Sequence, residues 1–126
     1  MSKIISKKDF VDAINAIAES VYDFHERWNL LINSKLPHDA IKEREGLLLE
    51  EVRELAQEYN KNQNEKSVKL LSREAADVLY VSAGSILALG KNGINAMHQV
   101  AEKNNNKTTK THYFNKEEKK VKKLDV

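Results

Sequence analysis

Apolar residues recur at steps of three and four along most of the chain, which is the period of an amphipathic α-helix. Four segments follow this pattern, and they cover residues 8–31, 40–59, 67–90 and 94–104. The only proline lies between the first two segments, and Asp39 shortly after it is the predicted N-cap of the second helix. The run Gly-Lys-Asn-Gly that begins at Gly90 is expected to end the third helix.

The C-terminal part of the chain lacks a sustained helical period. Residues 107–126 are expected to form a lysine-rich tail that is flexible or extended, in which residues 111–114 are the stretch suited to a short strand. The predicted domain organisation is therefore a helical domain over residues 1–106, followed by this tail.

The composition agrees with a helical protein. One proline and four glycines interrupt the 126 residues, and 32% of the residues are charged, which favours long solvated helices over a β-sandwich or barrel. The predicted fold class is all-α, a bundle of four to five helices. The third helix is apolar around its whole circumference and should be buried in that bundle. Together with the first helix it presents more apolar surface than one small subunit covers, so a homodimer or homotetramer is expected.

Several kinds of site and location are excluded or disfavoured by the same composition. Without cysteine there can be no disulfide, thiolate metal site or cysteine nucleophile. The N-terminus lacks the apolar core of a signal peptide, and no apolar run reaches the roughly 18 residues of a membrane-spanning helix. A cytoplasmic protein without a membrane partner is the expectation.

Charge is distributed unevenly along the chain. Residues 103–126 hold eight lysines against three acidic residues, a sum of +5, so the first 102 residues sum to −3 within a total of +2. A basic tail on a mildly acidic body suits an anionic small ligand, a nucleic acid or solubility alone. Charge by itself does not decide among these three.

Two pairs of acidic residues are the candidates for a functional site in this sequence. Glu51 and Glu54 are three residues apart on one flank of the second helix, a flank that also holds Glu58. Glu74 and Asp77 have the same spacing in the third helix, where no solvated face is available to them. An uncompensated carboxylate in such a place costs several kcal/mol, so a cation is expected to meet this pair.

Four carboxylates from two neighbouring antiparallel helices form the oxygen-rich cage that hard divalent cations prefer. Magnesium is the first choice and manganese the second, because no histidine has the Glu-x-x-His spacing of helical di-iron sites, and zinc is disfavoured for the same reason. The alternative is that the acids are ordinary surface charges, or that Glu74 and Asp77 pair with an arginine. The candidates for such pairing are Arg44, Arg53 and Arg73. The apolar surroundings of the second pair favour the metal site.

With these residues, the sequence resembles the all-α nucleoside triphosphate pyrophosphohydrolases, the superfamily that includes MazG-like, dimeric dUTPase-like and phosphoribosyl-ATP pyrophosphohydrolase-like proteins. The shared pattern is Glu-x-x-Glu, a spacer, then Glu-x-x-Asp, here within "REGLLLEEVREL" and "REAADVLYV". The segments "VYDFHERWNL" and "VAEKNNNKTTK" extend the similarity to most of the chain. The resemblance implies magnesium-dependent hydrolysis of a (deoxy)nucleoside triphosphate to the monophosphate and pyrophosphate.

The resemblance also implies roles for individual residues. Glu51, Glu54, Glu74 and Asp77 are the expected metal ligands. Glu50 is the candidate general base or outer-shell partner of the attacking water. Three further residues are expected to bind the substrate's phosphates or base, and they are Lys103, Asn104 and Lys107.

The sequence is also compatible with other functions. A phosphoribosyl-ATP pyrophosphohydrolase would use the same motifs. A non-catalytic helical module that binds nucleic acid through its basic tail leaves Glu74 and Asp77 unexplained, so nucleic acid is not the expected partner. Phe24 and Trp28 are expected to serve packing more than base stacking, with His25 facing solvent or a partner.

Overall fold

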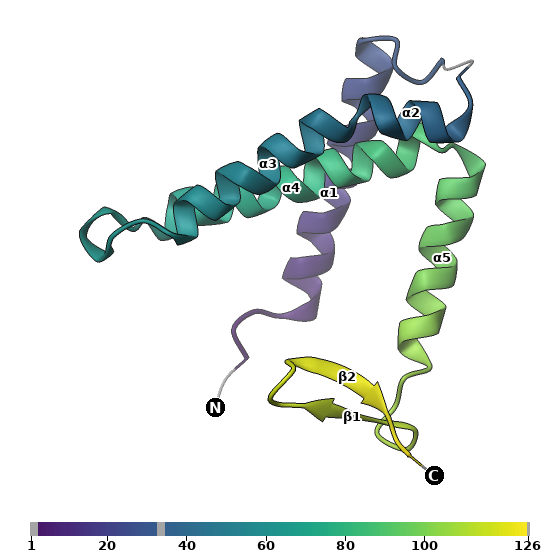
Figure 1. Ribbon diagram of the computed structural model, residues 1–126. Helices are drawn as coiled ribbons and strands as arrows, with labels where there is room; N and C mark the ends of the chain where they lie inside the picture. Colours follow the sequence, from purple (N-terminus) through teal and green to yellow (C-terminus); the bar gives the residue numbers. More distant parts are fainter. Residues whose placement is uncertain (1–2, 33–34, 126) are drawn as a thin grey trace. The chain divides into compact units, whose positions relative to one another are not determined.

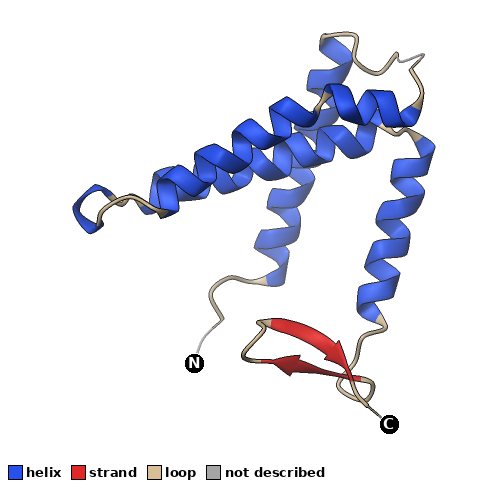
Figure 2. Cartoon of the chain, in the orientation of Figure 1, coloured by secondary structure: helices blue, strands red, loops and turns tan. Residues whose placement is uncertain are grey.

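The computed structural model describes residues 3–32 and 35–125. Figure 1 shows its elements, which are in chain order α1 (Lys7–Arg27), α2 (Pro37–Glu43), α3 (Glu45–Tyr59), the short 3-10 helix η1 (Gln63–Glu65), α4 (Val68–Ala88), α5 (Lys91–Asn105), β1 (His112–Asn115) and β2 (Lys120–Lys123). Helices dominate the described residues, and the strands form one small hairpin (Figure 2). The predicted helical class is confirmed, and the two-stranded sheet is an addition to it.

The chain divides into two compact units. The first is Met1–Gly90 and the second is Lys91–Val126, so α5 groups with the hairpin rather than with the four preceding helices. The division lies earlier in the chain than the predicted domain boundary after residue 106. No described helix is long and apolar enough to cross a membrane.

Helix ends follow the local sequence. The Ser67 side chain caps α4 by accepting a hydrogen bond from the backbone N–H of Leu70 at 3.3 Å, as the predicted start near residue 67 requires. Gly90 follows the last turn with φ +60°, a conformation that glycine adopts without the steric cost of a Cβ atom. The predicted bounds of this helix are therefore confirmed to within two residues.

The prediction of one continuous helix over residues 40–59 is wrong, because two helices, α2 and α3, meet at Arg44. The first of them begins at Pro37, whose fixed φ suits the first helical position, so Asp39 lies inside the first turn instead of capping it. At the junction the Arg44 side chain turns to α4, where Nε donates to Ser85 Oγ at 3.0 Å and Nη2 to the Val81 carbonyl at 3.2 Å.

In the first unit α4 is the central helix. It packs against α1, α2 and α3, and α3 lies along it as the second arm of a helical hairpin (Figure 1). Among the described residues the buried apolar side chains come from three helices and are Val21, Ala40 and Val81. The expectation that α4 is buried all round is wrong for the single chain, since Leu71 and Leu79 on its outer side are exposed.

An aromatic cluster joins α1 to α4. The Phe24 ring meets the Tyr80 ring edge-on at a centroid distance of 6.2 Å, and the Tyr80 hydroxyl donates to the Ser20 carbonyl at 3.1 Å. These contacts agree with a packing role for Phe24. Trp28 remains 61% exposed. His25 contradicts the expectation that it faces solvent or a partner, because only 5% of its surface is exposed.

The second unit begins with α5, which starts at Lys91, three residues before the predicted start. The expected strand at residues 111–114 exists as β1 over His112–Asn115, and it pairs antiparallel with β2, which the sequence analysis did not anticipate. Asn115 Oδ1 accepts hydrogen bonds from the backbone N–H groups of Glu117 and Glu118 at 3.0 and 2.9 Å, which closes the connecting turn.

Candidate metal centre

Three of the four predicted metal ligands lie together where α3 packs along α4. Glu51 and Glu54 are one turn apart on α3, and Glu74 faces them from α4. One carboxylate oxygen from each residue lies within 4.8 Å of the other two, and all three side chains are half-buried. This group is called the acidic cluster below.

The acidic cluster contains carboxylate oxygens without partners. Glu51 Oε2 and Glu74 Oε2 are closed off from solvent and accept no hydrogen bond from any described residue. Buried oxygen acceptors of this kind are rare because each one loses its hydration without compensation. A cation at the cluster would supply the missing interaction, so the residues present fit a hard divalent ion.

The electrostatics of the cluster favour a proton or a cation. Burial raises the pKa of Glu74, and the charges of Glu54, Asp77 and Glu58 raise it further. Burial also raises the pKa of Glu54, and the charge of Glu51 raises it further. Both shifts are in the direction that favours a proton, or a cation in its place, at these carboxylates.

Asp77, the fourth predicted ligand, is half-buried one turn along α4 from Glu74. Its charge raises the pKa of Glu74, but its oxygens are not in the group within 4.8 Å. Glu50 is exposed beside Glu51, and its charge is one of the causes that raise the pKa of Glu54. Both residues therefore lie within electrostatic reach of the cluster, at its edge.

Pairing with arginine does not account for the acids of α4. Among the residues that the structure describes, no salt bridge joins Glu74 or Asp77 to an arginine. Arg44, one of the candidates for such pairing, instead donates to Ser85 and to the backbone of Val81.

Glu58 lies within electrostatic reach of the acidic cluster, although it is not one of the three residues whose oxygens converge. Its Oε1 accepts from Lys61 Nζ at 2.7 Å, and its Oε2 is buried without a partner among the described residues. Its charge also raises the pKa of Glu74. The sequence does contain the signal, because Glu58 follows Glu54 by four residues on the same helical flank.

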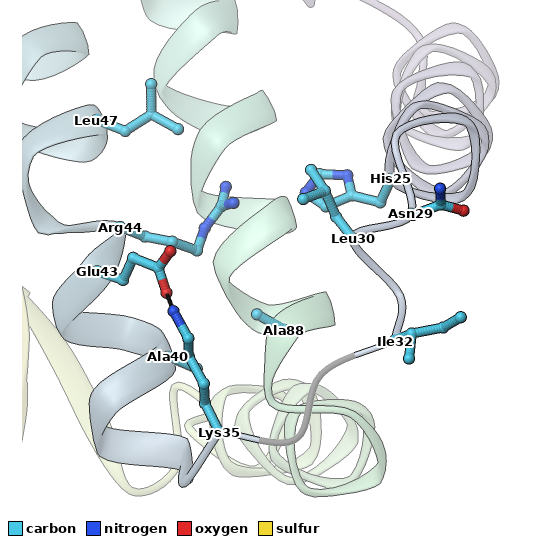
Figure 3. A pocket seen from close by; sticks show the side chains of 10 residues that line it. All are labelled: His25, Asn29, Leu30, Ile32, Lys35, Ala40, Glu43, Arg44, Leu47 and Ala88. Carbon is cyan, nitrogen blue, oxygen red and sulfur yellow. Dashed lines mark hydrogen bonds and ion pairs between the residues drawn. The ribbon is translucent and has the colours of Figure 1, made fainter.

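A cavity of about 330 Å³ lies apart from the acidic cluster, at the end of the first unit where α1, α2 and α4 meet (Figure 3). The His25 ring borders it, and since His25 Nδ1 lies 2.7 Å from the Val21 carbonyl oxygen, this nitrogen is the protonated donor. Nε2 is buried near Arg44 and the backbone of Gly84, and it has no hydrogen-bond partner among the residues that the structure describes. Glu43 and Lys35 form an ion pair on the opposite side of the cavity (Figure 3).

The predicted substrate-binding residues lie in the second unit. Lys103 and Asn104 are on the last turn of α5 and Lys107 follows it, and all three are exposed. Asn104 Nδ2 donates to the Val100 carbonyl of its own helix at 2.9 Å, which leaves its amide oxygen available to a ligand. The role of these residues stays a prediction.

Comparison of the chain with protein-family models, with curated protein sequences and with solved structures finds no match.

Proposed function

We propose that this protein hydrolyses a (deoxy)nucleoside triphosphate to the monophosphate and pyrophosphate with magnesium as cofactor and manganese as a substitute, and so acts in nucleotide-pool control. The observation that carries the proposal is the acidic cluster, in which half-buried carboxylates from α3 and α4 converge and leave closed-off oxygens with no hydrogen-bond partner among the described residues. The resemblance of these motifs to the all-α nucleoside triphosphate pyrophosphohydrolases supplies the reaction type.

In this proposal Glu51, Glu54, Glu74 and Asp77 hold the metal. Bound magnesium supplies positive charge to the phosphate oxygens and acidifies an attacking water. The carboxylates are held on two packed helices, so they are in place before substrate binds and little reorganisation is needed. Glu50, exposed at the edge of the cluster, accepts the proton of the attacking water through its carboxylate.

Lys103, Asn104 and Lys107 bind the triphosphate in the same proposal. Lysine ammonium groups provide charge without fixed directionality, whereas the asparagine amide both donates and accepts a hydrogen bond. Their exposure at the end of α5 leaves these groups accessible to a ligand.

The proposal includes self-association into a homodimer or homotetramer. Large apolar side chains are exposed on α1, at its C-cap and on α3, and they include Phe10, Val11, Tyr22, Trp28, Leu47, Leu49 and Val52. Apolar surface of this extent commonly marks a protein interface. Light scattering after size-exclusion chromatography is expected to give at least twice the mass of one chain, and a single-chain mass at every concentration would contradict this part of the proposal.

A panel of nucleotides tests the proposed reaction. Canonical ribo- and deoxyribonucleoside triphosphates and phosphoribosyl-ATP are incubated with the protein in magnesium or in EDTA, and the released pyrophosphate and phosphate are measured separately. Pyrophosphate is expected from at least one substrate, only in magnesium or manganese. Release of phosphate alone, or equal release in EDTA, would show that the proposed chemistry is wrong.

A further inference from the structure

The hairpin of β1 and β2 has an aromatic side chain on each face. In an antiparallel pair, residues directly opposite each other project to the same side, and successive residues alternate between sides. The register pairs Phe114 with Val121 on one side and Tyr113 with Lys122 on the other. Each aromatic ring is therefore presented on a separate face of a narrow ribbon.

Packing within the second unit does not explain these rings. In the described part of this unit α5 makes no packing contact with either strand. Phe114 is 56% exposed, and Tyr113 and Val121 are exposed as well. Because an isolated two-stranded hairpin is only marginally stable in water, exposed rings on both faces indicate a surface for a partner.

Positive charge surrounds both rings. Five lysines and two glutamates lie between residues 112 and 123, a net charge of +3. Lys122 pairs with Glu118. The remaining four lysines take part in no salt bridge within the described residues, and they are Lys116, Lys119, Lys120 and Lys123. A polyanion is the partner that this charge selects.

We propose that the hairpin binds single-stranded nucleic acid without sequence preference, a partner that the sequence alone did not favour. Proteins with this activity combine lysines that contact the phosphates with aromatic rings on which bases stack. A flexible strand of nucleic acid can reach the rings and lysines on both faces of the ribbon, whereas a flat anionic lipid surface meets one face only. Because stacking accepts any base, no motif for reading sequence is required.

The binding test uses the full chain and a fluorescein-labelled oligothymidylate in EDTA, with fluorescence anisotropy as the measurement. Contacts from four lysines predict a salt slope of about −0.7 × 4, or about −2.8, so binding should weaken about 50-fold between about 50 mM and about 200 mM salt. Changing both Lys120→Gln and Lys123→Gln should reduce the magnitude of the slope by about 1.4. Absence of binding at low salt, or a slope near zero, would overturn the proposal.

The stacking component is tested by Phe114→Leu, which keeps an apolar side chain on the strand and removes the ring. Tyr59→Leu is the matched control, because Tyr59 is 58% exposed and lies on α3. Affinity should fall at least about 5-fold for Phe114→Leu and stay unchanged for the control. Equal affinities of the two variants would contradict a role for the ring.

Two further measurements distinguish nucleic acid from a lipid surface, and binding by the hairpin from the proposed hydrolysis. Vesicles of phosphatidylcholine and phosphatidylserine that compete with the oligonucleotide at equal phosphate concentration would assign the hairpin to a membrane surface instead. Glu74→Gln, which acts on the acidic cluster, should bind the oligonucleotide as the unaltered chain does. Because the binding assay is done in EDTA, its result does not depend on whether the protein catalyses the proposed hydrolysis.

Discussion

Replacing Glu74 with glutamine should lower magnesium-dependent pyrophosphate release by more than about 100-fold, since loss of a direct ligand should exceed the 10–100-fold cost of losing an outer-shell partner. The same change should raise the thermal stability of the metal-free protein at neutral pH. Glutamine preserves the shape of the side chain but removes a charge that is half-buried among Glu54, Asp77 and Glu58. Loss of activity with a gain in stability separates a functional carboxylate from one that stabilises the fold.

The stability effect has a defined pH dependence. Burial and neighbouring charges raise the pKa of Glu74 above its ordinary value of 4.5. A carboxyl group with a raised pKa contributes stability that is fully present below its unfolded-state pKa and is lost as the pH rises through the folded-state pKa. The advantage of Glu74→Gln over the unaltered chain should therefore be small near pH 4.5 and grow toward neutral pH.

Thermal melts in EDTA at a series of pH values measure this difference directly. Glu65→Gln, at an exposed glutamate of η1, is the matched control and should leave both activity and the pH dependence unchanged. A Glu74→Gln protein that is less stable than the unaltered chain at neutral pH, or that retains its activity, would contradict the assignment.

Gly84→Ala should destabilise the first unit by about 1–3 kcal/mol, because the site is already filled. A Cβ atom at this position would lie 2.6 Å from Arg44 Nη2 and 2.9 Å from both Cε1 and Nε2 of His25. The new methyl group would displace the Arg44 side chain from Ser85 and Val81 and would push the buried imidazole away from α4. For a unit of this size the midpoint of thermal unfolding should fall by at least about 4 °C.

Gly46→Ala is the matched control for that substitution. Gly46 lies in α3, and a Cβ atom there would meet nothing within 4 Å. Alanine costs less conformational entropy than glycine in a helix, so this variant should be more stable by about 0.5–1 kcal/mol. Opposite shifts for the two variants are expected in thermal melts, and equal shifts would contradict the packing described around His25 and Arg44.

Helical periodicity predicts the helices because their apolar residues recur at steps of three and four. Burial does not follow in every helix, since the only buried residue of α5 among those described is Gly93. The break at Arg44 could not be read in the same way, since it depends on a tertiary contact in which the Arg44 side chain reaches Ser85 on α4. The burial of His25 is a similar case, because its environment is set by Arg44 and Gly84, which lie far along the chain. β2 was missed because four residues rich in lysine carry little apolar signal.

In the acidic cluster, too, the positions along each helix could be predicted from the sequence, whereas the contact between helices could not. Spacing along each helix places Glu51 and Glu54 on one flank, and the apolar surroundings of Glu74 point to a special role. The convergence of these three carboxylates depends on the register in which α3 packs along α4, which periodicity alone does not set. The charges of Asp77 on α4 and Glu58 on α3 both raise the pKa of Glu74, and neither residue belongs to the group of three.

Titration of the protein with manganese, followed by the electron paramagnetic resonance signal of the free ion, tests the metal centre most directly. Manganese is expected to bind to the unaltered chain with at least one ion per chain, to be displaced by magnesium, and to be lost in Glu74→Gln but not in Glu65→Gln. A free-ion signal equal to that of buffer, or equal binding by all three proteins, would contradict the assignment of the acidic cluster as a metal site.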